Sequence, residues 1–435
     1  MKKMICDNLS VNEKGELCFA GRSTVELAKK YDTPVYFFDE KKIRSNVRLY
    51  LDAMNKAFDG NATVLFASKA ASFKSIYKIV ADEGMGADVV SIGEIYTAKS
   101  ANFHMENIYF HGNNKTDYDI EFSIDNGVGC IIADNFEEID AIESICSARG
   151  ITQKVMLRLT PGIDPHTYEE VATGKVDSKF GSAIETGAAE KITKYTLDKE
   201  HIDLCGFHCH VGSQVFDSDV YIASAKVMIK FMAEMNEKYG YVTKELNLGG
   251  GYGVRYVDED PEIDIAANIE QVSVELKTLM SSYNMPMPKI IMEPGRSIVA
   301  DAGMTLYTVG TVKCIPEYKN YVSIDGGMGD NPRYALYKSK YTVICANKAN
   351  DECDFECSVV GRCCESGDII AENVKMPSSI KRGDLVAVLT TGAYNYSMSS
   401  NYNRLPKPGI VMINGDEDYV AVKAETLDDL IRNDM

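Results

Sequence analysis

The chain has 435 residues, of which 45% are hydrophobic and 25% are charged. This composition is ordinary for a folded globular protein, and the length suits two or three domains, or one large barrel with an additional domain. The formal net charge of -18 disfavours nucleic acid as a partner, because phosphate binding requires clustered Lys and Arg side chains.

Cysteine usage and hydropathy indicate the compartment. The 12 cysteines are scattered along the chain, and the N-terminal residues lack the apolar segment of a secretory signal. No uninterrupted apolar run reaches the roughly 18 residues that a membrane-spanning helix needs. We therefore expect a cytoplasmic protein with reduced thiols, a small-molecule substrate, and neither a nucleic acid nor a membrane partner.

The first two-thirds of the chain alternate between strand and helix patterns. Eight apolar, β-branched runs are separated mostly by stretches of helical length and periodicity. Such alternation predicts parallel strands with crossover helices, and eight units over about 230 residues match a (β/α)8 barrel of the TIM type. An open doubly wound sheet is the alternative, but it would gather its polar groups at one switch point. The eight runs are residues 63–68, 86–90, 107–110, 128–133, 154–160, 204–211, 244–248 and 289–292.

The pattern changes after residue 296, where strand-like runs are separated by turn residues. We expect a mostly antiparallel β domain over residues 297–435, joined by N-terminal strands in residues 1–34, and a barrel over residues 35–296. The alternation also fails between residues 161 and 203, at segments that break helices. Because a long irregular connection is usually functional, residues 161–181 are a candidate active-site loop.

Lys69 lies directly after the first barrel strand and is followed by small residues. Active sites of such barrels lie at the carboxyl ends of the strands, which places this amine in the barrel mouth. A lysine held among apolar neighbours can have a lowered pKa and attack a carbonyl to form a Schiff base. A lysine that merely extends into solvent is the simpler interpretation of this residue alone. Polar groups after the other strands favour the functional interpretation.

The sixth strand ends in the segment HCHVGSQ, residues 208–214. Successive strand residues point to opposite faces, so His208 and His210 share a face and Cys209 takes the other. A metal site built from these three residues and Cys205 is the alternative, but zinc needs four convergent ligands. We favour two imidazoles beside a planar cofactor, one of them stacked on it.

The seventh and eighth strands end in segments that suit an anion and a ring nitrogen. The glycines of NLGGGYG, residues 247–253, would let backbone N–H groups approach a phosphate, which many barrels bind at this position. Glu293 would lie in the barrel mouth opposite Lys69, with Arg296 beside the glycine run, although a surface Glu–Arg pair is the simpler alternative. Together with the lysine and the stacking histidine, these groups describe pyridoxal 5'-phosphate, whose protonated ring nitrogen makes it an electron acceptor.

Motifs along nearly the whole chain resemble the fold-type III pyridoxal phosphate decarboxylases, which share the barrel of alanine racemase. CESGD at residues 364–368 together with DNPR at residues 330–333 resembles the diaminopimelate branch of that family. The other matching segments are FASKA (66–70), ADVVSIGE (87–94), HGNNK (111–115), PGIDPHT (161–167), TGKVDSKFG (173–181), HCHVGSQ (208–214), NLGGGYG (247–253), EPGR (293–296) and GAYNYSMSSNYN (392–403).

The resemblance implies roles for individual residues. Lys69 would be the Schiff-base lysine, Glu293 the partner of the pyridine nitrogen, His210 the group stacked on the ring, and Cys364 the acid that protonates the substrate carbon. The implied cofactor contacts are Lys69, Asp88, His210, Ser213, Gly250, Gly251, Glu293, Pro294, Gly295, Arg296 and Tyr394. The implied substrate contacts are Arg296, Arg333, Tyr337, Glu365 and Tyr394. In this family Cys364 and Glu365 would come from the other subunit, which implies an obligate homodimer with shared active sites.

The reaction that the resemblance implies is the decarboxylation of meso-2,6-diaminoheptanedioate to L-lysine and CO2, the last step of lysine biosynthesis, by a carboxy-lyase. Arg333 and Glu365 suit the carboxylate and the ammonium of a second amino-acid head, whereas ornithine would leave Arg333 unpaired. The alternatives are a related decarboxylase acting on D-ornithine, D-lysine, arginine or carboxynorspermidine, an amino-acid racemase on the same barrel, and a catalytically silent regulator. A racemase or a regulator would release no CO2.

Overall fold

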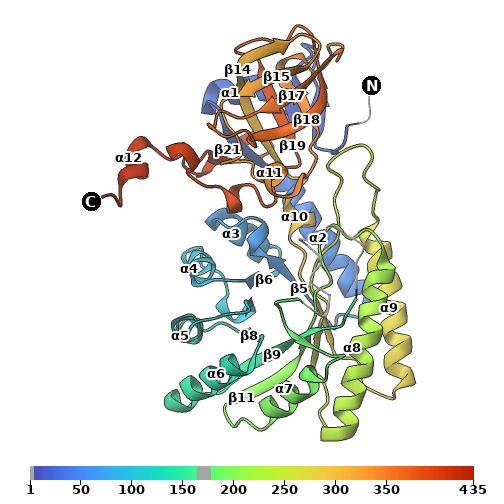
Figure 1. Ribbon diagram of the computed structural model, residues 1–435. Helices are drawn as coiled ribbons and strands as arrows, with labels where there is room; N and C mark the ends of the chain where they lie inside the picture. Colours follow the sequence, from blue (N-terminus) through green and yellow to red (C-terminus); the bar gives the residue numbers. More distant parts are fainter. Residues whose placement is uncertain (1–3, 164–177) are drawn as a thin grey trace. The chain divides into compact units, whose positions relative to one another are not determined.

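The computed structural model describes residues 4–163 and 178–435, and the chain divides into two compact units (Figure 1). The barrel unit contains Asn46–Gly253 and Glu262–Gly295, and the β unit contains Met1–Ser45, Val254–Pro261 and Arg296–Met435. Much of the predicted loop over residues 161–181 lies outside the described residues. None of the helices in the described part of the chain has the length and apolar character needed to span a membrane.

Eight parallel strands form the barrel, as the alternating pattern predicted. Neighbours in chain order pair with one another, and β13 pairs with β5, so the sheet closes on itself and is not an open doubly wound sheet. The short strand β10 (Ser182–Ala183) pairs with β9 outside this ring. The eight strands are β5 (Ala62–Ala67), β6 (Gly86–Val89), β7 (Ile108–Phe110), β8 (Cys130–Ala133), β9 (Gln153–Thr160), β11 (Ile202–His208), β12 (Glu245–Asn247) and β13 (Lys289–Met292).

Helices cover the outside of these strands (Figure 1). Buried, mostly apolar side chains of the strands form a cluster inside the barrel. Strands β6, β7 and β8 are buried along their whole length because both of their faces are covered. The interior cluster consists of Leu65, Tyr109, Cys130, Ile132, Met156, Cys205 and Ile291. The helices are α2 (Glu40–Ala57), which crosses the boundary between the units, α3 (Lys74–Asp82), α4 (Ile92–Ser100), α5 (Asp117–Asp125), α6 (Phe136–Arg149), α7 (Ala188–Leu197), α8 (Ser218–Tyr239) and α9 (Ile265–Ser282).

The β unit is built on a mostly antiparallel sheet in the order β18-β17-β15-β14-β4-β20-β21, and β19 pairs with both β14 and β16. Among the described strands of the β unit, only the β15–β17 and β4–β20 pairs are parallel. The strands are β4 (Val35–Asp39), β14 (Gly303–Ile315), β15 (Lys319–Ile324), β16 (Val343–Cys345), β17 (Phe355–Val360), β18 (Ile369–Met376), β19 (Leu385–Leu389), β20 (Gly409–Asn414) and β21 (Glu417–Val422). Short helices are α10 (Arg296–Val299), α11 (Arg333–Tyr337) and α12 (Leu427–Ile431).

The N-terminal residues pack into the β unit. Leu17 and Phe19 share an apolar core with Leu306 and Val411. This segment forms a small sheet and one helix, namely β1 (Leu9–Val11), β2 (Leu17–Phe19), β3 (Arg22–Ser23) and α1 (Thr24–Tyr31).

Strand β4 lies in a different sheet from the one that the sequence suggested. We placed Val35–Asp39 at the start of the barrel, but it pairs with β14 on one side and β20 on the other. All five of its residues are buried because the strand is central in that sheet. An apolar run of this kind has no local feature that distinguishes a central strand of one sheet from a barrel strand.

Candidate active site

Glu293 follows β13 and is 5% exposed. Its carboxylate lies 2.8 Å from Nε2 of His111 and 3.1 Å from Nε2 of His208, and it accepts a hydrogen bond of 2.7 Å from Nδ2 of Asn247. These partners stand at the carboxyl ends of β7, β11 and β12. Burial alone would raise the pKa of the Glu293 carboxyl, but the electrostatic interaction with His111 and the hydrogen bonds with His111 and His208 hold this pKa well below its usual range. The mouth of the barrel therefore contains a buried anion.

The two histidines of HCHVGSQ are neutral at pH 7. Burial lowers the pKa of His208 to about 3 and the pKa of His210 well below its usual range. His208 packs edge-to-face on His111, with ring centroids 4.7 Å apart. Nδ1 of His208 has no hydrogen-bond partner in the described part of the chain, so its hydrogen can sit on Nε2 and point to Glu293.

The metal site considered from the sequence does not form. Sγ of Cys205 lies 4.0 Å from Sγ of Cys130 in the barrel interior, and Sγ of Cys209 lies 3.3 Å from Oγ of Ser224. Among the described residues, the one group with metal-ligand spacing is His111, His208 and Glu293, and these side chains are already bound to one another.

Lys69 lies in a short 3-10 turn, Ser68–Ala70, after β5. Its side chain is exposed, although Ala67, Ser68 and Ala70 around it are buried. The charge of its amine acts on Asp88, Glu94 and His210. The amine therefore lies within electrostatic range of charged and polar groups. Burial raises the pKa of Asp88, and its Oδ1 lacks a hydrogen-bond partner among the described residues.

The glycine run is packed so closely against other backbone that side chains would not fit. A Cβ on Gly250 would lie 2.0 Å from the carbonyl oxygen of Glu293, and one on Gly251 would lie 2.3 Å from that of Gly212. Gly249 has φ +70, and a Cβ there would lie 2.8 Å from Nδ1 of His210. Because these glycines have no side chains, the backbone of the run packs directly against the segments that carry His210 and Glu293.

In the β unit, two arginines and three tyrosines form a second cluster. Nη1 of Arg296 donates to the hydroxyl of Tyr256 at 2.7 Å, and Nη1 of Arg333 donates to the hydroxyl of Tyr341 at 2.8 Å. Cζ of Arg296 lies 4.7 Å from the ring centroid of Tyr394, whose φ is +61°. Both arginines are buried, 7% and 5% exposed. Buried guanidinium groups with phenol partners are suited to bind anions.

The Asp368 carboxylate and the Asn403 side chain, which accepts the backbone N–H of Cys364 at 2.7 Å, hold the loop that carries Cys364 and Glu365. Asp368 accepts hydrogen bonds from the backbone N–H of Met328 at 2.6 Å and of Cys363 at 2.7 Å. Cys364 and Glu365 themselves are exposed.

The sequence-predicted residues are distributed over both units. Lys69, Asp88, His210, Ser213, Gly250, Gly251, Glu293, Pro294 and Gly295 lie in the barrel unit. Arg296, Arg333, Tyr337, Cys364, Glu365 and Tyr394 lie in the β unit. Sequence reasoning assigned no role to His111, Asn247, Tyr256 or Asp368. The sequence could have indicated His111 and Asn247, because each stands at the carboxyl end of a predicted barrel strand.

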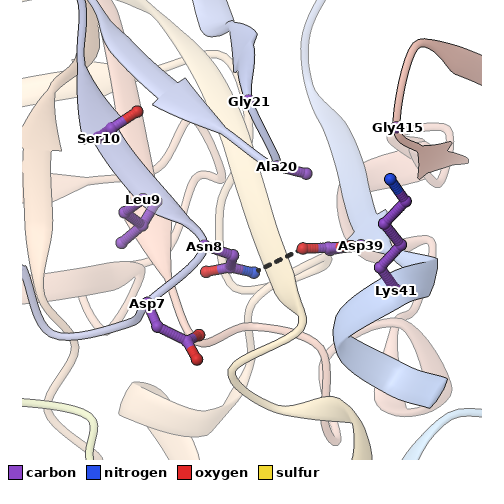
Figure 2. Close-up of a pocket in the computed structure, with 9 residues that line it drawn as sticks. All are labelled: Asp7, Asn8, Leu9, Ser10, Ala20, Gly21, Asp39, Lys41 and Gly415. Atoms are coloured by element: carbon purple, nitrogen blue, oxygen red, sulfur yellow. Dashed lines mark hydrogen bonds between the residues drawn. The ribbon is translucent and has the colours of Figure 1, made fainter. Parts of the chain in front are cut away.

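The β unit also has a pocket of about 240 Å³ beside β1 and the turn at Gly415 (Figure 2). Figure 2 shows Asn8 donating to the Asp39 carboxylate, at 3.3 Å. The same carboxylate accepts the backbone N–H of Lys42 at 3.2 Å. None of the sequence-predicted site residues lines this pocket, and we assign it no ligand.

Comparison with known proteins decides the family. Residues 42–300 match the model of the pyridoxal-dependent decarboxylase, pyridoxal binding domain. The chain belongs to this family. It is 43% identical over 413 residues to a diaminopimelate decarboxylase from Bacillus methanolicus, covering 95% of each chain, and 42% identical over 424 residues to one from Bacillus subtilis, covering 98% of this chain and 96% of that one. The solved diaminopimelate decarboxylase of M. jannaschii in complex with L-lysine has a TM-score of 0.90 and 32% identity, covering 100% of this chain and 99% of that one.

The family cofactor, pyridoxal phosphate, fits the groups that the barrel unit presents. Glu293 is a buried anion suited to a protonated ring nitrogen, and Lys69 is an exposed amine suited to a carbonyl. The side-chain-free backbone of the glycine run suits a phosphate. The enzyme is a pyridoxal-phosphate-dependent carboxy-lyase.

Proposed function

We propose that the enzyme decarboxylates meso-2,6-diaminoheptanedioate to L-lysine and CO2, the final step of lysine biosynthesis. The observation that carries this proposal is the buried guanidinium of Arg333, a cation suited to bind a distal carboxylate. The names of the full-length relatives and the lysine complex of the M. jannaschii enzyme support the same substrate.

We assign the following roles in the barrel unit. Pyridoxal phosphate, when bound, accepts the electron pair that the departing carboxylate leaves behind. Lys69 would hold the cofactor covalently. The Glu293 anion would keep the ring nitrogen protonated, and His210 would pack on the ring as a neutral imidazole. Asp88, Ser213, Gly250, Gly251, Pro294 and Gly295 would complete the contacts with the cofactor.

The β unit would supply recognition and the proton. Arg296 and Tyr394 would bind the phosphate and the substrate, while Arg333 and Tyr337 would bind the distal head of the substrate. Glu365 would accept the distal ammonium, and Cys364 would deliver a proton from Sγ to the carbon that has lost CO2.

We also propose that the enzyme is a homodimer in which Cys364 and Glu365 complete the active site of the partner subunit. Their exposure on a loop fixed by Asp368 supports this. Mixing the inactive variants Lys69→Ala and Cys364→Ala should restore activity, because hybrid dimers contain one site with both native residues. Mixtures that stay inactive after subunit exchange would contradict shared sites.

The substrate is tested by CO2 release from the cofactor-loaded enzyme. The assay compares meso-2,6-diaminoheptanedioate with L-lysine, L-ornithine, D-ornithine and arginine. We expect release from the first compound and none from the others. Preferential release from an amino acid without a second head would contradict the role of Arg333.

A further inference from the structure

Two chain segments pass from barrel strands into the β unit, and a side-chain hydrogen bond joins them. Val254–Pro261 follows the glycine run, and Arg296 follows Glu293 by three residues. The bond runs from Nη1 of Arg296 to the hydroxyl of Tyr256, which is 4% exposed. The segments after the predicted phosphate loop and after the predicted ring-nitrogen partner are therefore held together by one phenol.

Arg333 packs on the same phenol. Its Cζ lies 4.9 Å from the ring centroid of Tyr256, and Tyr256 packs edge-to-face on Tyr341, the hydrogen-bond acceptor of Arg333, with centroids 5.3 Å apart. Tyr256 thus touches both arginines, one through its oxygen and one through its ring.

The partners of Arg333 are neutral. In the described part of the chain, no carboxylate lies within ion-pair distance of the Arg333 guanidinium, whose neighbours are Tyr256 and Tyr341. An aspartate in place of Tyr256 or Tyr341 would neutralise the positive charge of the arginine. A phenol instead satisfies a guanidinium N–H group and leaves the positive charge available for an anion. Burial alone would raise the pKa of Tyr256, but Arg296 and Arg333 lower it, which indicates a strongly positive environment.

We propose that Tyr256 is a positioning residue that holds Arg296 and Arg333 as a pair, so that one phenol orients the arginine for the cofactor phosphate and the arginine for the distal carboxylate of the substrate. The part of this proposal that concerns Arg333 and the substrate, the substrate half, rests on the proposed function. The part that concerns Arg296 and the cofactor phosphate, the phosphate half, depends on the cofactor alone.

The test separates phosphate recognition from other cofactor contacts. The full chain, stripped of cofactor, is titrated with pyridoxal phosphate and with pyridoxal, which lacks the phosphate. In Tyr256→Phe the dissociation constant of pyridoxal phosphate should rise roughly 10- to 100-fold, the factor expected for a hydrogen bond to a charged group, while that of pyridoxal changes less than twofold. KM for meso-2,6-diaminoheptanedioate should rise as well, with kcat within about twofold.

The matched control is Tyr241→Phe, which removes a buried hydroxyl that donates to the carbonyl of Leu204 within the barrel unit. This variant should leave the ratio of the two dissociation constants unchanged. The proposal is wrong if Tyr256→Phe weakens pyridoxal and pyridoxal phosphate equally, or if Tyr241→Phe changes the ratio as much. A changed ratio without CO2 release from meso-2,6-diaminoheptanedioate would uphold the phosphate half and overturn the substrate.

A measurement on the wild-type chain covers the case in which Tyr256→Phe does not fold. At alkaline pH, inorganic phosphate added to the cofactor-free chain should lower the tyrosinate absorbance. An anion bound at Arg296 offsets the positive charge that favours the phenolate of Tyr256, so the phenol takes up a proton. Phosphate binding with no loss of tyrosinate would contradict the proposal.

Discussion

Replacing Glu293 by glutamine keeps the size of the side chain but removes its negative charge. The carboxylate now accepts hydrogen bonds from His111, His208 and Asn247, at 2.8, 3.1 and 2.7 Å. A glutamine oxygen at the Oε1 position would keep the hydrogen bonds with His111 and Asn247. Its NH2 group would then face Nε2 of His208, which can accept because Nδ1 is free to carry the hydrogen. We therefore expect the variant to fold, with a loss of about 1–3 kcal/mol in the free energy of unfolding.

The effect on catalysis should be larger. A neighbouring opposite charge changes the pKa of an ionisable group by about 1–3 units, so without the Glu293 anion the cofactor's ring nitrogen should bind its proton roughly 10- to 1,000-fold more weakly. Because only the protonated ring accepts electrons well, kcat should fall by a factor in the same range. KM should change little, since Glu293 has no proposed contact with the distal part of the substrate.

The assay measures kcat, KM and urea denaturation for Glu293→Gln beside the matched variant Glu245→Gln. Glu245 is also buried and also holds two charge-assisted partners, Tyr109 at 2.9 Å and Lys154 at 2.7 Å, but it lies at the beginning of β12 instead of after a strand end. We expect both variants to lose similar stability and only Glu293→Gln to lose kcat. The reasoning is refuted if Glu293→Gln keeps kcat within twofold, or if Glu245→Gln loses as much.

Three further predictions concern recognition, acid stability and the proton donor. Arg333→Met should raise KM for meso-2,6-diaminoheptanedioate by roughly 10- to 100-fold through loss of a charge-assisted contact, and steady-state assays showing unchanged KM would remove Arg333 from recognition. Because the pKa of His208 falls from 6.5 unfolded to about 3 folded, the unfolded chain binds the extra proton between those values, so the free energy of unfolding should decrease by about 1.6 kcal/mol from pH 6.5 to pH 5. Urea denaturation should show that His208→Gln lacks this portion of the pH slope, and an unaltered slope would assign it to other groups. Cys364→Ser should lower kcat with little change in KM, because a hydroxyl is a far weaker acid than a thiol; unchanged turnover would exclude Sγ as the proton source.

The sequence predicted the barrel well because each strand and helix leaves a local periodic pattern, and Lys69 and Glu293 directly follow such runs. The partners of Glu293 were harder to predict. His111 and Asn247 are far from it in sequence. Pairing of β12 with β13 brings Asn247 close, and closure of the barrel brings His111 close. The different position of β4 has a related cause: an all-buried run gives no information about which sheet it joins.

In the β unit, the sequence predicted even fewer of the contacts between distant residues. Arg333 and Cys364 were identified by resemblance, since their surroundings have no periodic signal. Tyr256 gave no signal at all, because its segment follows a barrel strand in sequence and yet belongs to the other unit. Contacts that depend on two distant segments meeting, such as Tyr256 with Arg296, require the structure.

The most direct measurement quantifies CO2 and L-lysine together, from meso-2,6-diaminoheptanedioate incubated with the cofactor-loaded wild-type enzyme and with Lys69→Ala. We expect equal amounts of the two products from the wild type and neither from the variant. Interconversion of stereoisomers without CO2, or substantial CO2 release by Lys69→Ala, would contradict the proposed decarboxylation at Lys69.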